Sequence, residues 1–422
     1  MILFKWGLRP HEGSTRTPPT GTGWFRRRGA LALLGAAGLS LAGCGAPPSD
    51  PRLVSEAAIP VRPAPSPTPA AYPPVRFPAD EAPHDVLAEW WYYTGHLYGS
   101  DGDEYGFELV FFRGVRGDRP PGYAAHFAVT DLSQQRFRYD QRVDVALNEV
   151  AQPVPGTPVP GTPVPGAASA AEGARPVGTV ALPQPGGGFD LALGDWRMRG
   201  RDGHDVLSAT MPEYRLDATL TALRPPALHL GEPPIRPGLI TLGPAGYSYY
   251  YSRTRMALSG TLVVEGEPRP VEGEAWMDHQ WGDFLVLGGG GWDWFAANLR
   301  DGRDLTLSFV RNEQGTIVQA FGTLVDANGE SRRLPPGSFQ LTPTGTWTSP
   351  HTGIRYPSGW RLQISEAQLD LLWTPLLADQ ELDSRPSTGV VYWEGAVRLQ
   401  DAATQADVGR GYVELTGYAP PR

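Results

Sequence analysis

The chain has 422 residues, enough for two or three domains, because compact domains usually hold about 100–200 residues. Its formal net charge of −9 argues against nucleic-acid binding, since neutralising phosphates requires clustered basic groups. The single cysteine excludes an internal disulfide, and the 52 glycines and 44 prolines indicate that unstructured segments accompany the ordered domains.

The N-terminal segment is typical of a bacterial lipoprotein signal peptide. Three arginines at 26–28 precede an apolar run over 30–41, and the sequence Leu-Ala-Gly-Cys ends at Cys44. A basic region, a short apolar region and small residues before the cleavage point are what export systems recognise, and the run is too short to span a bilayer. We therefore expect residues 1–44 to be a signal peptide, with Cys44 acylated.

Acylated Cys44 would anchor the mature protein on the extracytoplasmic face of a bacterial membrane, in the cell envelope. Two alternatives remain. The small-residue pattern before Cys44 arises by chance, or the arginine triplet serves twin-arginine export. The first would leave Cys44 unmodified, and the second would change only the route of export.

Two segments are poor in groups that a fold could bury. Residues 45–83 are rich in proline, alanine and serine, and such chain stays extended, so they predict a tether. Residues 153–166 repeat a five-residue proline and glycine unit that continues into an alanine-rich and glycine-rich stretch. Because proline removes backbone donors and glycine adds chain entropy, we predict a disordered loop insertion over 152–178.

The remaining sequence has a β pattern almost throughout. Turn sequences with Asp-Gly or Asn-Gly lie at 100–103, 300–303 and 326–329. One short helix is predicted at 366–372. Short aromatic or β-branched runs predict strands at 104–113, 135–143, 214–223, 249–264, 303–311, 360–365 and 390–399. Strands at this spacing predict an all-β fold of sandwiches or barrels.

One aromatic hairpin pattern occurs twice, 202 residues apart. The recurring residues are Trp90, Tyr92, Tyr93 and Leu97 in the first copy and Trp292, Trp294, Phe295 and Leu299 in the second. Each half is long enough for a barrel of eight or more short strands. We predict tandem antiparallel β-barrels over 84–245 and 246–422, with coincidence between two hairpins as the alternative.

The densest group of titratable and aromatic residues lies at 273–283. If this segment is a strand, Trp276 and Asp278 share a face and His279 points to the other. A carboxyl group walled by indoles loses solvation, so its pKa rises and it can act as a general acid near neutral pH. The alternative is that Asp278 closes a turn and caps backbone amides while the tryptophans pack.

Other chemistry has little support. No two of the eight histidines lie within five residues of each other, so the sequence predicts no metal site, and we expect no cofactor. The aromatic run at 90–93 is either core or the lining of a pocket for an extended apolar ligand.

Several motifs resemble the AttH and carotenoid 1,2-hydratase family over about residues 84–420. They are Trp90-x-Tyr92-Tyr93, Trp276-Met-Asp-His-Gln-Trp-Gly282 and Gly411-Tyr-Val-Glu-Leu-Thr-Gly-Tyr418. The resemblance implies two lipocalin-like barrels packed together. It also implies an apolar pocket and, in the hydratase branch, an aspartate that protonates the terminal double bond of an acyclic carotenoid.

The resemblance places the hydratase aspartate at Asp278. A tyrosine of the hydratases falls on Trp276, and their His-x-Trp pair falls on Tyr249 and Tyr251. These replacements keep an aromatic cage. The expected contacts of a hydrophobic small-molecule ligand are Trp91, Tyr93, Tyr249, Tyr251, Trp276 and Trp281, with His126 and Arg253 at the polar end.

The residues and the resemblance together allow two functions. The first is an enzyme that acts on a hydrophobic, isoprenoid-like substrate by acid-catalysed hydration or a related cofactor-independent reaction, with Asp278 as the proton donor. The alternative is a binding protein or transport accessory that holds a lipid-like ligand and works with an export system. True hydrolysis is a further alternative.

Overall fold

The computed structural model describes residues 72–115, 121–144, 175–181, 186–231, 234–242, 246–284 and 290–419. The predicted signal peptide with Cys44, and most of the predicted tether and insertion, lie outside these residues. Within them no helix combines the length and the hydrophobicity that crossing a bilayer requires. Two short 3-10 helices are present, η2 (Ala79–Glu81) and η4 (Ser365–Ala367).

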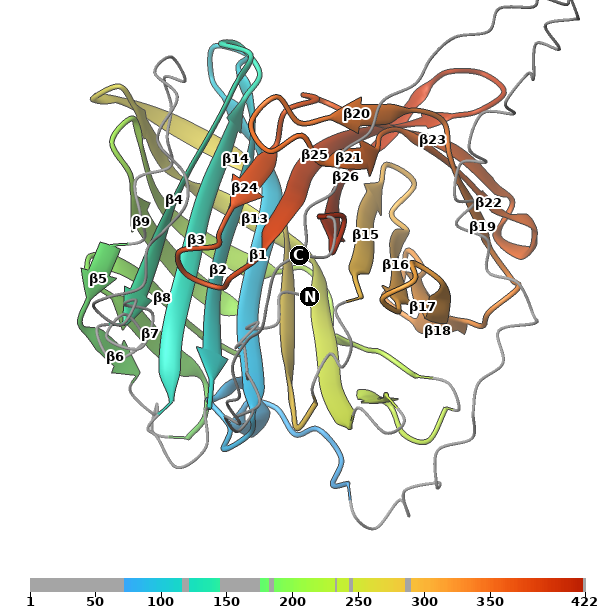
Figure 1. Cartoon of the computed structure of the whole chain (residues 1–422), viewed down its shortest axis with the longest axis horizontal. Coiled ribbons are helices and arrows are strands. Elements are labelled where there is room, and N and C mark those ends of the chain that lie inside the picture. The colour runs from blue at the N-terminus through green and yellow to red at the C-terminus, as the bar shows by residue number, and fades with distance from the viewer. Residues whose placement is uncertain are drawn as a thin grey trace, which may run out of the picture. The chain divides into compact units, whose positions relative to one another are not determined.

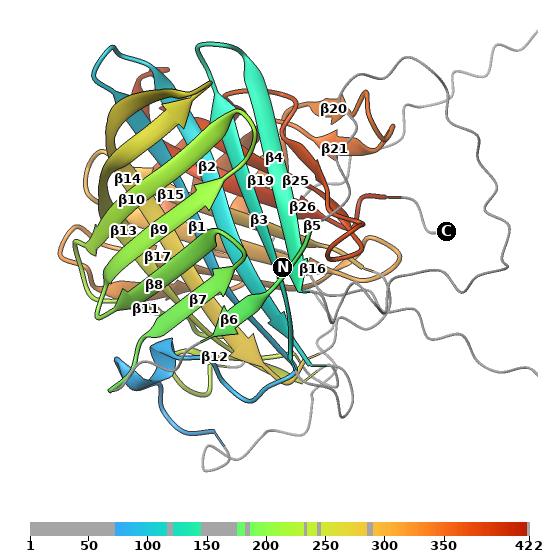
Figure 2. The ribbon, with the colours of Figure 1, turned by 90° about the vertical axis from the view of Figure 1, so that its left-hand side faces the viewer.

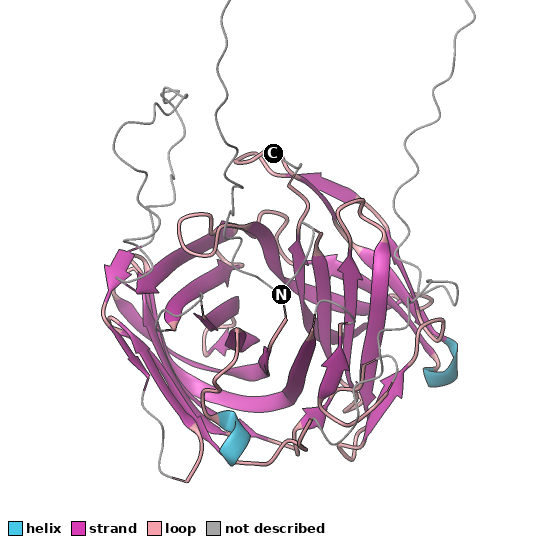
Figure 3. Ribbon diagram, turned by 60° about the horizontal axis from the view of Figure 1, so that its bottom comes forward, coloured by secondary structure: helices cyan, strands magenta, loops and turns pink. Residues whose placement is uncertain are grey.

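The first sheet curls around its own core (Figures 1 and 3). Among the described residues its strands are β1 (Ala88–Gly99), β2 (Glu104–Gly114), β3 (Gly122–Asp131), β4 (Arg136–Asp144), β5 (Arg175–Val177), β6 (Thr179–Ala181), β7 (Phe189–Leu193), β8 (Trp196–Arg201), β9 (His204–Thr210), β10 (Tyr214–Ala222), β11 (Ala227–Leu228), β12 (Leu239–Thr241), β13 (Tyr247–Val264) and β14 (Glu267–Gly282). They follow the order β5-β4-β3-β2-β1-β14-β13-β10-β9-β8-β7-β6, and β11 and β12 also pair with β13. Figure 2 shows β10, β9, β8 and β7 as tilted neighbours in this barrel.

The second sheet is a curved half-barrel over its own apolar core (Figure 1). Its strands are β15 (Trp292–Leu299), β16 (Asp304–Arg311), β17 (Ile317–Val325), β18 (Ser331–Leu334), β19 (Gln340–Pro343), β22 (Trp360–Ile364), β23 (Leu369–Pro375), β24 (Glu381–Asp383), β25 (Val391–Asp401) and β26 (Asp407–Thr416). Their order is β18-β17-β16-β15-β26-β25-β23-β22-β19, with β24 on β25, while β20 (Thr346–Thr348) pairs with β21 (Arg355–Pro357).

The two sheets confirm the all-β tandem architecture. In the first, β1 lies between β2 and β14, and in the second, β15 lies between β16 and β26. The repeated hairpins therefore occupy equivalent positions, each flanked by the next strand and by the last strand of its own sheet.

The predicted boundary at 245/246 lies two strands too early. β13 pairs with β10 and β14 pairs with β1, so both belong to the first sheet. The reason is visible in their apolar residues, because Leu258, Leu262 and Val264 pack into the core of the first barrel. The second sheet begins at β15.

Three other predictions need correction. Part of the predicted tether packs on the first barrel, since Tyr72 and Phe77 contact its core. Residues 175–177, predicted as disordered, form β5 beside β4, where an edge strand tolerates a proline.

The predicted helix at 366–372 is wrong. Only η4 forms there, and the inward alternation from Leu369 onward makes β23.

Both faces of β1 are buried. Trp91 and Tyr93 point into the first barrel, and Trp90 and Tyr92 point into a cluster shared with the second sheet. The sheets approach closely here, because a Cβ atom added at Gly106 of β2 would lie 2.7 Å from a side-chain atom of β25 and 2.9 Å from one of β26. The outer face of β1 and β2 is thus covered by the second sheet.

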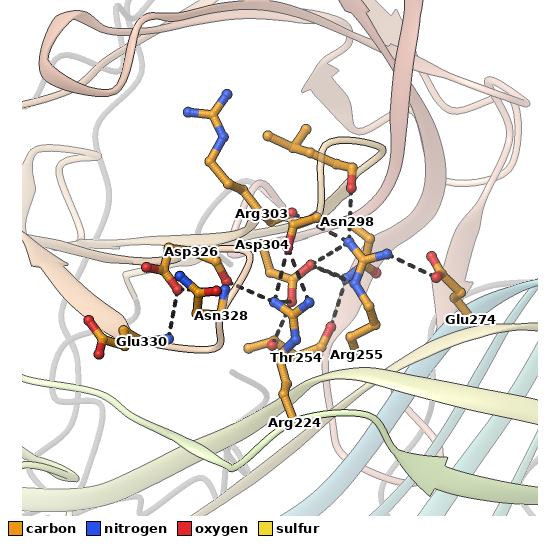
Figure 4. Close-up of polar contacts among 12 residues, drawn as sticks. Arg224, Thr254, Arg255, Glu274, Asn298, Arg303, Asp304, Asp326, Asn328 and Glu330 are labelled. Carbon is orange, nitrogen blue, oxygen red and sulfur yellow. Dashed lines mark hydrogen bonds and ion pairs between the residues drawn. The ribbon is translucent and has the colours of Figure 1, made fainter.

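A buried carboxylate links the two sheets (Figure 4). Asp304 of β16 is fully buried and accepts hydrogen bonds from Thr254 (2.8 Å), Arg255 (2.7 Å) and Asn298 (2.8 Å). Arg224, from the first barrel, makes an ion pair with it at 2.8 Å. Four partners compensate for the desolvation of this charge, so the pair of barrels is held by a polar contact as well as by apolar packing.

Asp304→Ala should destabilise the fold strongly, by about 3–5 kcal/mol, because it leaves two arginines without their buried partner. Chemical unfolding followed by fluorescence measures the change. The matched control is Glu274→Ala, which removes an exposed partner of Arg255 at 2.9 Å and should change stability by less than about 1 kcal/mol. Equal effects of the two variants would contradict a structural role for Asp304.

Candidate functional site

Asp278 lies on β14 and is buried between the two sheets. Its carboxyl group accepts hydrogen bonds from Tyr250 (2.7 Å) and from the indole N–H of Trp276 (2.6 Å), and a third from Ser252. Strand pairing produces this arrangement, since Ser252 of β13 lies directly opposite Asp278. Trp276 and Asp278 share a face, as predicted from their spacing.

Burial raises the pKa of Asp278 to about 7, against the opposing effect of its three hydrogen-bond donors. A carboxyl group is ordinarily ionised at neutral pH, whereas burial keeps the proton on this one up to near neutral pH. It therefore holds a proton that can be given to a bound molecule at physiological pH.

A small pocket opens beside Asp278, and its empty volume is about 330 Å³, part of which is open solvent. Its walls come from four strands of the first sheet and two of the second. The lining residues are Trp90, Tyr92, Phe112, Tyr250, Asp278, Gln280, Trp292, Trp294 and Glu414. The pocket is therefore mainly aromatic, with three polar side chains besides the hydroxyl groups of Tyr92 and Tyr250.

Behind Asp278 the hydrogen bonds continue away from the pocket. The hydroxyl of Ser252 lies 2.7 Å from Nε2 of His229, whose Nδ1 lies 2.8 Å from the hydroxyl of Thr323 on β17. Burial lowers the pKa of His229 to about 3, so its ring is neutral. The serine stands between the aspartate and the histidine. A hydrolytic triad needs the histidine in the middle, so this order does not fit one.

Most of the predicted ligand contacts lie on the opposite face of the same strands. Their side chains are buried in the first barrel's interior, away from Asp278: Trp91, Tyr93, Tyr249, Tyr251 and Trp281 pack in its core, and Arg253 pairs with Glu81. The residues that face Asp278 from β13 are Tyr250 and Ser252, one position along from the expected pair.

A β-bulge explains this shift by one residue. β13 and β14 meet at a turn where Val264 pairs with Glu267, and regular pairing from there would place Arg253 opposite Asp278. An extra residue on β13 between Arg253 and Met256 moves Ser252 into that position. Neighbouring side chains of a strand point to opposite faces. One inserted residue therefore moves every side chain of β13 beyond the bulge to the face opposite the one that regular pairing predicts.

His126 lies between the sheets, behind the wall of the pocket. Its Nδ1 is 2.7 Å from the hydroxyl of Tyr392, which donates to Glu108 at 2.9 Å, and its ring contacts Phe112. Burial lowers the pKa of His126 to about 3, and burial raises the pKa of Glu108 to about 8. Neutral side chains therefore surround the pocket on this side.

Sequence reasoning missed several residues of the site: His229, Tyr250, Ser252, Gln280 and Glu414. Trp292 and Trp294 were recognised only as repeat positions. Gln280 could have been found, because it shares the face of Trp276 and Asp278. The others depend on strand register or on contacts between the sheets, which spacing along one strand does not reveal.

A second polar cluster lies on the inner face of the first barrel. Among the described residues, His84, Glu89 and His279 form a group whose donor atoms all lie within 4.8 Å of one another, close enough to hold a metal ion. The sequence predicted no metal site because the histidines are 195 positions apart. Pairing of β1 with β14 brings Glu89 close to His279, and the segment before β1 adds His84.

Two lipocalin-like barrels with a protonatable acid buried between them define the class of this protein. The chain belongs to the AttH-like family, whose model matches residues 68–418. This match confirms the family resemblance seen in the sequence.

Solved structures share the fold. An AttH candidate from Nitrosomonas europaea is 32% identical with a TM-score of 0.65, over 82% of this chain and 98% of that one. Kievitone hydratase from Nectria haematococca is 18% identical with a TM-score of 0.58, over 82% and 94% of the two chains. CghA with Sch210972 is 11% identical with a TM-score of 0.52, over 80% and 90%. No curated protein matches the sequence.

The raised pKa of Asp278 predicts a pH dependence of stability. The folded state holds the proton up to about pH 7, whereas the unfolded chain releases it near its ordinary pKa of 3.8, so this group makes folding less favourable as pH rises between those values. Asp278→Asn does not titrate. Its stability relative to the wild type should therefore rise with pH, by up to about 1.4 kcal/mol per pH unit.

Urea unfolding of both forms at several values between pH 4 and 8 measures this difference. Asp205 and Glu108, which also have raised pKa values, are present in both forms and cancel in the comparison. Parallel stability curves would contradict a raised pKa at Asp278.

Proposed function

We propose that this protein is an enzyme that hydrates a carbon–carbon double bond of a hydrophobic, isoprenoid-like substrate without a cofactor. The observation that carries the proposal is the position of Asp278, a carboxyl group with a pKa of about 7 on the wall of an aromatic pocket. Protonation of an alkene needs an acid that is still neutral when the substrate binds.

In the proposed reaction Asp278 gives its proton to one alkene carbon, and the π electrons form the new C–H bond. The other carbon becomes a cation, which the faces of Trp90, Trp292 and Trp294 stabilise. Water adds its lone pair to the cation and loses a proton to the Asp278 carboxylate. The product is a tertiary alcohol when the cation is tertiary, and the acid is restored.

The polar residues of the pocket suit the second half of this reaction. Gln280 and Glu414 line the same space as Asp278 and supply a donor and acceptors for the attacking water. Tyr250 and Ser252 stabilise the carboxylate that forms after proton transfer. The sequence predicted that Tyr249, Tyr251 and Trp281 contact the ligand. In the proposed reaction the tryptophans of the pocket make these contacts instead.

The comparisons support this class of reaction in a general way. One structural neighbour bears the name of a hydratase. The competing function is non-catalytic binding of a lipid-like ligand, and the small size of the pocket favours it, because a long substrate would leave most of its length outside. The test below separates the two functions.

Asp278→Asn should lower turnover by about two to four powers of ten while leaving the fold intact, because the amide cannot donate a comparably acidic proton. The assay incubates the protein with lycopene or squalene in H₂¹⁸O and follows incorporation of the label by mass spectrometry. The matched control is Asp205→Asn. That carboxyl group is also buried, with a pKa raised to about 7, but it contacts Tyr93 inside the first barrel.

Activity lost in both variants would indicate a general effect of removing a buried acid, and activity kept in Asp278→Asn would remove it from catalysis. Saturable binding of these probes by the wild type without any product would favour the binding protein.

The proposal includes a location. The segment that ends at Cys44 supports a lipoprotein anchored on the extracytoplasmic face of a bacterial membrane, where hydrophobic substrates are at hand and an export system could be a partner.

Cys44→Ser should move the protein from the membrane fraction to the soluble fraction, because the acylated thiol is lost. Immunoblotting of fractionated cells measures the distribution. The wild type made in the same cells is the control, and labelling with a radioactive fatty acid should mark only that form. A Cys44→Ser variant that stays with the membrane would contradict the lipid anchor.

A further inference from the structure

The cluster of His84, Glu89 and His279 has the composition of a metal site. Glu89 begins the inner face of β1, His279 lies on the same inner face of β14, and His84 comes from the segment before β1. Glu89 Oε1 is 2.7 Å from Nδ1 of His84 and 2.9 Å from Nε2 of His279. Two imidazoles and a carboxylate therefore converge on one point from three places in the chain.

The outer ring nitrogens of both histidines also have partners. Nε2 of His84 lies 3.7 Å from Asp80, and Nδ1 of His279 lies 3.3 Å from the hydroxyl of Tyr251. Metal-binding histidines show this arrangement, with one ring nitrogen on the ion and the other held by a polar group that fixes the tautomer. The arrangement leaves Nδ1 of His84 and Nε2 of His279 directed at Glu89.

Aromatic rings hold the two imidazoles in place. The ring of His84 stacks on Trp281 at 4.3 Å between centroids, and that of His279 stacks on Trp91 at 4.7 Å. His279 and Glu89 are fully buried, whereas the side chain of His84 is 20% exposed. The site is thus rigid on its inner side and open to solvent at His84.

We propose that His84, Glu89 and His279 bind Zn²⁺, with a solvent molecule in the fourth position beside His84. Two histidines and a carboxylate are a known zinc donor set, and an open fourth position is typical of catalytic zinc. Tetrahedral bonds of about 2.0–2.2 Å separate donor atoms by about 3.3 Å, so the present contacts widen by roughly half an ångström. The half-buried segment that carries His84 lies outside the strands and can supply this movement.

This site is distinct from the pocket of Asp278. Residues 278 and 279 are neighbours on β14, so their side chains point to opposite faces of the sheet. Asp278 faces the second barrel, and His279 faces the interior of the first. The zinc proposal therefore does not rest on the proposed hydration and can be tested apart from it.

The test titrates Zn²⁺ into untagged, full-length protein that has been treated with a chelator and dialysed, at pH 7.5, by calorimetry. We expect one equivalent to bind and His84→Ala to weaken binding at least about 100-fold. The matched control is His351→Ala, which removes an exposed histidine side chain that pairs with Asp379, far from the cluster in the sequence. It should leave the affinity unchanged. Melting curves of each variant without metal show that the fold is intact.

A second measurement reports ligation directly. Co²⁺ in the wild-type site should give the intense visible absorption of a tetrahedral ion, and His84→Cys should add a thiolate-to-cobalt band in the near ultraviolet. Lack of saturable binding in the wild type would overturn the proposal. Equal Zn²⁺ affinity in His84→Ala and His351→Ala would also overturn it. Either result would mean that the three residues form only a hydrogen-bonded cluster that holds the segment before β1 against the barrel.

Discussion

Burial of β1 and of the second half of β14, residues 275–282, on both faces is the constraint on which the rest of the structure depends. A strand of an ordinary barrel has one apolar face, but these strands present aromatic side chains inward to their own core and outward to the second sheet. The outward face requires a partner, and the second barrel supplies it. Because the partner is another sheet, polar groups caught between the two must find hydrogen bonds there.

Two of the polar groups buried between the sheets are carboxyl groups, and their charge and pKa depend on the side chains around them. Asp304 lies among arginines and serves as a charged link between the sheets. Asp278 instead accepts hydrogen bonds from the neutral donors of Ser252, Tyr250 and Trp276, and burial accordingly raises its pKa. The same interface thus contains a carboxylate that stabilises the fold and a carboxyl group that holds a proton.

The sequence predicted the fold well because the signals for strands and hairpins are local. The aromatic hairpins, the Asp-Gly turns and most strands lie where alternation and turn residues placed them. The helix predicted at 366–372 failed because a short apolar run does not distinguish a helix from a strand, and the inward alternation from Leu369 to Trp373 made the difference.

The site was predictable only in part. That Asp278 and Trp276 share a face was predictable because they lie on one strand at a spacing of two. The sequence pointed to Tyr249 and Tyr251, but the residues beside Asp278 are Tyr250 and Ser252. The bulge near Arg253 changes which side chains of β13 face Asp278, and no pattern in the sequence marks this bulge. His84 and His279 are far apart in the sequence, and they meet because β1 pairs with β14 and the segment before β1 lies beside that pair.

The repeated hairpins give the pocket an internal symmetry. Tyr92 and Trp294 are equivalent positions of the two copies; Asp278 lies opposite Tyr92 on the last strand of the first sheet, and Glu414 lies opposite Trp294 on the last strand of the second. The two carboxyl groups of the pocket therefore occupy equivalent positions on the last strands of the two sheets. The two positions carry different residues, so a molecule bound between the sheets meets an aspartate from one sheet and a glutamate from the other, an asymmetry that a pocket on the axis between two identical subunits does not have.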